Sequence, residues 1–139
     1  MTSERTADSR LEELSSEECM RLLAYGSYTG HVGFVREGRV TILPVNYLFD
    51  DDALVIRTHA GTPLSGLEGE AVAFEVDDRR PLGHSGWSVL VHGQVHVITD
   101  ASTLDRLRRG PLRSWAWPHA DLWLRLSIDT VTGRRVAES

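Results

Sequence analysis

The stretch from Arg39 to Leu67 constrains the fold most strongly. Two apolar runs rich in β-branched residues, 39–49 and 53–58, flank three consecutive aspartates. Such runs favour extended backbone, and a short acidic segment between them is typical of a turn. The stretch therefore predicts a β-hairpin, followed by a short helical turn over residues 62–67.

Pro44 lies inside the first strand of this hairpin. Proline has no N–H to donate to a ladder, so the strand should be irregular or lie at an edge of the sheet there. We expect main-chain groups around this position to be free to meet a ligand, namely those of Leu43, Pro44, Val45 and Asn46.

The second strand ends in Arg57 and Thr58, a cation beside a hydroxyl donor. The N–H groups at the start of the helical turn that follows favour an anion. These features suit a flat ligand that bears a phosphate. The residues alone leave a second interpretation open, in which Arg57 pairs with the nearby acidic turn.

The rest of the chain alternates short helices with strands. Ser15 and Glu18 form a capping-box pattern that predicts a helix over 16–24, and a second helix is expected over 100–109. Strands are predicted over 29–35, 70–77, 86–99 and 121–128, with a loop over 78–86 and a bend at Gly93.

These elements predict a mainly β fold with short α-helices, namely a closed or split β-barrel of six to seven mostly antiparallel strands. Residues 1–10 are polar and terminal, so we expect them to be disordered. Residues 11–136 are expected to form a single domain, a size sufficient to bury a core.

Composition and charge indicate which partners and which cellular location to expect. A net charge of −5 gives no reason to expect a nucleic-acid partner, and no apolar run approaches the length that spans a membrane. The polar N-terminus lacks the apolar core of a signal peptide, and the single cysteine, Cys19, excludes an internal disulfide. A cytoplasmic location is expected.

The histidines do not predict a metal site. His92 and His96 share one strand face, but four residues along a strand span about 13 Å, too far for one ion. We therefore expect no metal. A Ser-His-Asp constellation is also not visible, so catalytic residues stay unknown, while His31 and His59 remain candidates for a substrate pocket.

The order and spacing of three segments resemble a known family. The segments are 42–47, then 54–58 with Gly61 and Leu64, and then 86–93. They are similar to the flavin-binding half of the pyridoxamine 5′-phosphate oxidase-like superfamily, the split β-barrel FMN-binding proteins. The resemblance covers residues 15–135 approximately and implies an FMN-binding split barrel.

The resemblance also implies roles for individual residues. The backbone of 43–46 would line the isoalloxazine ring, and Arg57, Thr58 and Thr62 would hold the phosphate, with Leu64 in the same motif. A second wall of the site would come from Trp87, Ser88 and Val89, although Trp87 also suits core or dimer packing.

One position departs from the family pattern. Relatives commonly carry a lysine where this chain has Pro63, so one cation for the phosphate is missing. Thr62, the main-chain N–H groups of this turn and an arginine elsewhere would have to compensate.

The resemblance further implies a homodimer with FMN at its interface, and Trp115 or Trp117 is assigned to that interface or to the substrate pocket.

The predicted function is that of a flavin-dependent oxidoreductase acting on an undefined small molecule, with a nicotinamide donor bound transiently. Two alternatives stay open. The protein is a non-catalytic flavin carrier or sensor, or it is a split barrel that binds haem or a deazaflavin. His31, His59 or His92 would supply the axial ligand to haem.

Overall fold

The computed structural model describes residues 11–26, 29–80, 85–112 and 121–136. In chain order, the elements are β1 (Leu11–Glu13), α2 (Ser16–Tyr25), β2 (Thr29–Arg36), β3 (Arg39–Asp50), β4 (Ala53–His59), the 3-10 helix η1 (Pro63–Gly66), β5 (Ala71–Arg80), β6 (Ser85–Val97), α3 (Ala101–Arg108), β7 (Asp121–Ser127) and β8 (Thr130–Val136).

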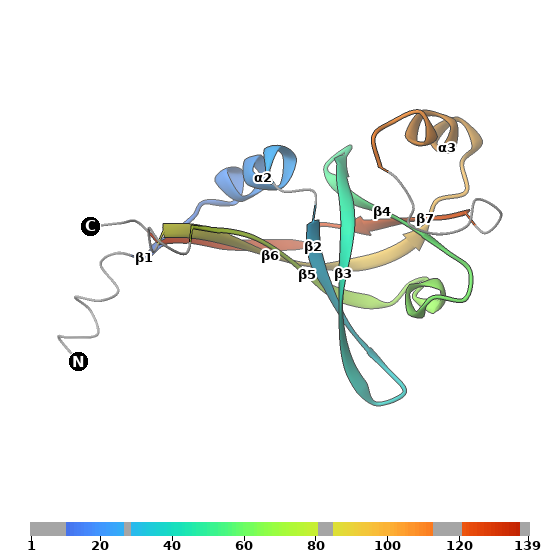
Figure 1. The fold of residues 1–139 in the computed structure, drawn as a ribbon, viewed down its shortest axis with the longest axis horizontal. Helices are drawn as coiled ribbons and strands as arrows, with labels where there is room; N and C mark the ends of the chain where they lie inside the picture. Colours follow the sequence, from blue (N-terminus) through green and yellow to red (C-terminus); the bar gives the residue numbers. More distant parts are fainter. Residues whose placement is uncertain (1–10, 27–28, 81–84, 113–120, 137–139) are drawn as a thin grey trace.

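The eight strands form one sheet in the order β1-β8-β6-β5-β2-β3-β4-β7. A further pairing of β6 with β7 closes six of them into an antiparallel barrel (Figure 1). The mainly β split-barrel fold predicted from the sequence is thereby confirmed.

Two strands add to the predicted set. β8 pairs along β6 from Gly86 to His92, and β1 pairs with β8. β8 is rich in threonine and arginine, and its apolar residues do not alternate with polar ones. Pairing with a neighbouring strand, rather than a local sequence pattern, therefore makes it a strand. Residues 78–80 and 85–86 also extend β5 and β6 where a loop was expected.

The predictions for residues 1–10, Trp115 and Trp117 concern positions outside the described residues.

Tight turns join the strands around the predicted hairpin. Asp51 and Asp52 both have positive φ, 51° and 56°, between β3 and β4. Glu37 and Gly38, at 52° and 75°, turn β2 into β3 in the same way. Two consecutive residues with positive φ match the twist of antiparallel strands, so both turns hold their hairpins in register.

The two helices pack on different parts of the barrel, α2 beside β6 and α3 beside β4 and β7 (Figure 1). The predicted capping box of Ser15 and Glu18 is present at the start of α2, whose Cys19 and Leu23 are buried in the barrel core. α3 buries Leu107 in a second cluster with Val55 and Trp123. Neither of these helices is long and apolar enough to cross a membrane.

Gly93 is the corner of the barrel. Up to His92, β6 pairs with β8, and from Val95 it pairs with β7. A Cβ atom at position 93 would overlap the carbonyl oxygen of Ser127. The absence of a side chain therefore lets β6 approach the end of β7 closely enough to change partners.

We expect Gly93→Ala to destabilise the fold by about 2 kcal/mol or more, because the added methyl group must push β6 and β7 apart. Urea unfolding measures this change. Gly33→Ala is the matched control, since a Cβ there meets its nearest neighbours at 3.9 Å. Equal stability of the two variants would contradict the assignment of Gly93 as the corner.

Candidate functional site

β3 and β4 part beyond a short paired segment. β4 pairs with β3 only from Tyr47 to Asp50, whereas β2 pairs with the other side of β3 from Arg39 to Asn46. Among the described strands, none pairs with the β4-facing edge of 39–46. Pro44 therefore lies at an edge as predicted, and the main chain of Leu43 to Asn46 has no strand partner on that side.

The side chains of this edge alternate between the two faces of β3. Leu43 and Val45 are partly buried against the barrel core. Pro44 is exposed, and the amide oxygen of Asn46 accepts a hydrogen bond from the Thr29 hydroxyl at 3.3 Å. A ligand at this edge would thus meet main-chain groups and the rims of two apolar side chains.

Arg57 is held on the side of the barrel that faces α3. Its Nε donates to Asp121 at 2.8 Å, its Nη1 donates to the Leu112 carbonyl at 3.2 Å, and the guanidinium lies 4.8 Å from the Trp123 ring centroid. The acidic turn is not its partner, because Asp50 there binds Arg106 and Arg125 instead.

Thr58 points to the opposite face of β4, since successive side chains of a strand alternate. It is buried, and its hydroxyl lies 2.9 Å from that of Thr62, which also donates to the His59 carbonyl at 3.1 Å. Leu64 is buried beside them in the core. The structure thus brings Thr58 and Thr62 together and separates both from the guanidinium of Arg57.

The predicted second wall lies elsewhere in the sheet. Val89 is fully buried and Trp87 packs against the core, which leaves Ser88 on the outer face. β5 and β2 lie between β6 and β3 in the order of the sheet. Within one chain, these residues do not flank the edge of β3.

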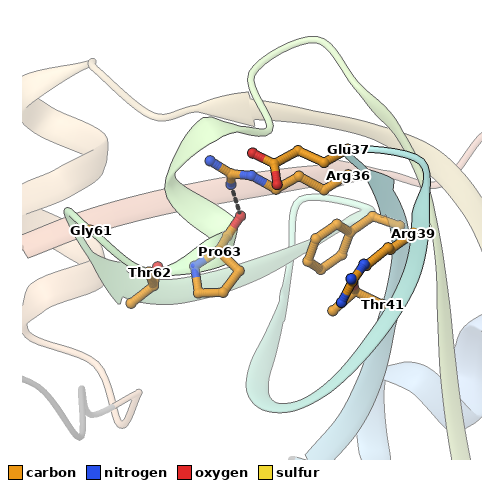
Figure 2. A pocket seen from close by; sticks show the side chains of 8 residues that line it. Arg36, Glu37, Arg39, Thr41, Gly61, Thr62 and Pro63 are labelled. Atoms are coloured by element: carbon orange, nitrogen blue, oxygen red, sulfur yellow. Dashed lines mark hydrogen bonds between the residues drawn. The ribbon is translucent and has the colours of Figure 1, made fainter.

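A pocket of about 350 Å³ lies where the β2–β3 hairpin meets the start of η1 (Figure 2). Arg36 reaches across and donates from Nη1 to the Pro63 carbonyl at 2.6 Å. The pocket is lined by Phe34, Arg36, Glu37, Arg39, Thr41, Gly61, Thr62 and Pro63. Of these, only Thr62 was predicted as a site residue. The two arginines precede Pro63 by more than twenty positions, so no local spacing indicated them.

Two carboxylates link α3 and neighbouring strands. Burial by itself raises the pKa of Asp121, but hydrogen bonds from Arg57, Trp123 and Arg108 outweigh it, so the net pKa is lowered. Hydrogen bonds from Arg106, and more weakly from Arg125, lower the pKa of Asp50 against the opposing effect of burial. Both groups therefore stay ionised and keep their arginines in place.

The histidines are dispersed over the molecule. The Nδ1 of His31 lies 3.6 Å from Glu75, and burial together with the neighbouring Asp77 raises the pKa of that carboxyl group. The Nδ1 of His59 lies 3.0 Å from the Ala60 carbonyl. Within the described ranges, no group of three or more potential ligands could hold a metal ion. Roles for these histidines remain predictions.

Comparison with known proteins shows the family. Residues 15–135 match the family described as pyridoxamine 5′-phosphate oxidase. The chain belongs to this family. The resemblance predicted from its sequence segments is therefore confirmed.

Among relatives of this pyridoxamine 5′-phosphate oxidase-like chain is the uncharacterised protein Rv0080 of Mycobacterium tuberculosis. It is 34% identical over 130 residues, which cover 89% of this chain and 84% of Rv0080. A structure of the FAD-binding protein from Mycobacterium smegmatis superposes with a TM-score of 0.79 at 29% identity and covers 92% of this chain and 100% of its own. The FAD-binding protein of Mesorhizobium loti shares the fold, with a TM-score of 0.72 at 20% identity and 91% and 99% coverage.

We expect Asp121→Asn to destabilise the fold at neutral pH by about 2 kcal/mol, because Arg57 and Arg108 lose a charged acceptor. The pKa of Asp121 is lower in the fold than in the unfolded chain. Its carboxylate therefore contributes full stability above the unfolded pKa of about 3.9, and the contribution is lost as pH falls through the native pKa.

Unfolding free energies measured between neutral and acidic pH should show the gap between wild type and Asp121→Asn narrowing below the unfolded pKa. Asp129→Asn changes an exposed carboxylate and serves as the control. A gap that is the same at every pH would show that the charge of Asp121 is not its cause.

Proposed function

We propose that this protein binds a flavin, specifically FMN, and acts as a flavin-dependent oxidoreductase on a small molecule. The observation that carries the proposal is the unpaired edge of Leu43 to Asn46, which opens where β4 leaves β3. The FAD-binding relative from Mycobacterium smegmatis, at 29% identity over nearly the whole chain, supports a flavin as the ligand class.

The residues at this edge fit a flavin ring. Main-chain N–H and C=O groups along an unpaired edge offer both donors and acceptors, as the pyrimidine edge of an isoalloxazine requires. Leu43 and Val45 add apolar surface beside a planar ring. A bound flavin would supply electron and hydride transfer, while the chain orients it and excludes water. The tail of the flavin would run toward Thr58 and Thr62.

We propose that a second copy of the chain completes the site. Val35, Val40 and Ile42 lie on one face of the β2–β3 hairpin and expose 64%, 76% and 65% of their surfaces. Three exposed β-branched side chains in one patch are typical of an interaction surface. Because β5 and β2 separate β6 from β3 in the sheet of one chain, a partner copy would be the source of Trp87 and Ser88.

The substrate is proposed to differ from pyridoxamine 5′-phosphate. That substrate needs a basic site for its own phosphate in addition to the site for the flavin phosphate, and the candidate that the sequence offers for it is Arg134 with Arg135. Arg135 already forms ion pairs with Glu18 at 3.6 Å and Glu12 at 3.9 Å. A small substrate without a phosphate group, reduced at the expense of a nicotinamide donor, fits this chain better.

We expect the protein, after incubation with FMN and desalting, to retain about one flavin per chain, visible as bands at about 370 and about 450 nm. Anaerobic addition of NADH or NADPH should bleach the longer-wavelength band. Retained flavin that neither nicotinamide reduces would favour a carrier or sensor. A Soret band in the purified protein would favour haem, and a retained deazaflavin would favour a deazaflavin cofactor. A chain that retains no flavin, haem or deazaflavin would refute the proposal.

We expect Val40→Glu to convert the dimer to monomers and to weaken FMN retention by at least about tenfold, since a buried charge opposes association and the site loses its second wall. Sedimentation velocity and fluorescence titration measure both effects. Tyr25→Gln alters an 86% exposed apolar residue on α2 and is the control. Unchanged mass and affinity in Val40→Glu would exclude the hairpin as the interface.

A further inference from the structure

The cation that relatives place at position 63 has no substitute at that position in this chain. The sequence contains no lysine, and position 63 is proline. Arg57, the other expected cation, has two of its donors directed to Asp121 and Leu112 and its plane against Trp123. A phosphate at the Thr58–Thr62 turn therefore needs positive charge from another part of the fold.

The β2–β3 hairpin places that charge beside the turn. Arg36 spans 27 positions of sequence to reach the Pro63 carbonyl, and this bond uses one of its five N–H donors. Gly66 makes room for it, because a Cβ at position 66 would lie 3.2 Å from the Arg36 Nη1. The guanidinium is thereby positioned against η1, directly next to the proline that replaces the lysine.

Arg39 adds a second cation on the neighbouring strand. Figure 2 shows it beside Thr41, with Arg36 and Pro63 across the same pocket. The charged side chains that line the pocket are the two arginines and Glu37, so its lining carries a net positive charge. Arg39 forms no ion pair with any other described residue, and its guanidinium is available for a bidentate contact.

We infer that Arg36 and Arg39 form an anion site that holds the terminal phosphate of the flavin in place of the missing lysine. The inference rests on the proposed flavin function and names the part of the chain that recognises the phosphate. Arg36 also fixes the hairpin to η1 through its hydrogen bond to the Pro63 carbonyl.

The test compares FMN with riboflavin, which lacks only the phosphate. In fluorescence titrations, Arg39→Gln should weaken FMN binding by about tenfold and the double variant Arg36→Gln with Arg39→Gln by about a hundredfold. Riboflavin affinity should change by less than about twofold in both. Arg36→Lys keeps the charge and should lose less than Arg36→Gln. Arg21→Gln, on exposed α2 surface, is the control.

Isothermal titration with inorganic pyrophosphate separates this inference from the flavin proposal. If the double variant keeps wild-type FMN affinity, the anion site is refuted while flavin binding stands. If the wild type binds no flavin but binds pyrophosphate in a manner abolished by Arg39→Gln, the anion site stands and the flavin proposal fails. If it binds neither, both are wrong.

Discussion

The fold depends on the way β3 shares its two edges between neighbours. Residues 39–46 pair with β2 and residues 47–50 pair with β4, so the strand is never covered on both sides at the same position. Tyr47 sits at the change of partner. It is buried, its hydroxyl donates to the Leu23 carbonyl of α2, and its ring meets Phe74 edge-on at 5.3 Å. The core thus secures the point at which the sheet opens, and the opened edge can stay exposed without loss of the barrel.

The site that follows from this opening is distributed over distant segments. In the proposed site, main-chain groups would come from β3, hydroxyls from Thr58 and Thr62, and positive charge from the β2–β3 hairpin. Arg57 pairs with Asp121, so the arginine elsewhere that the sequence analysis expected to compensate would be Arg36 or Arg39 of the hairpin. On the proposed function, this arrangement would allow proline at position 63.

Local sequence patterns predicted most of the helices, strands and turns. They predicted few of the contacts between side chains that are distant in the sequence. Positive φ at Asp51 and Asp52, the edge at Pro44 and the Ser15 capping box follow from residues close together in sequence. In contrast, Asp121 lies 64 positions from Arg57, and β8 becomes a strand by pairing along the edge of β6. Such pairings form when the barrel closes, so the periodicity of the individual segments does not predict them.

The two helices differ in how they are attached, and this difference has a physical consequence. α2 is held by buried Cys19 and Leu23 and by a longer ion pair of Glu18 with Arg135. α3 adds to buried Leu107 the shorter pairs Arg106–Asp50 and Arg108–Asp121. Salt screens exposed ion pairs, and strongly hydrated salts strengthen apolar packing. A strongly hydrated salt therefore weakens the ion pairs of α3 while it strengthens the apolar packing that both helices share. The attachment of α3, whose ion pairs are shorter, is the more sensitive of the two to screening.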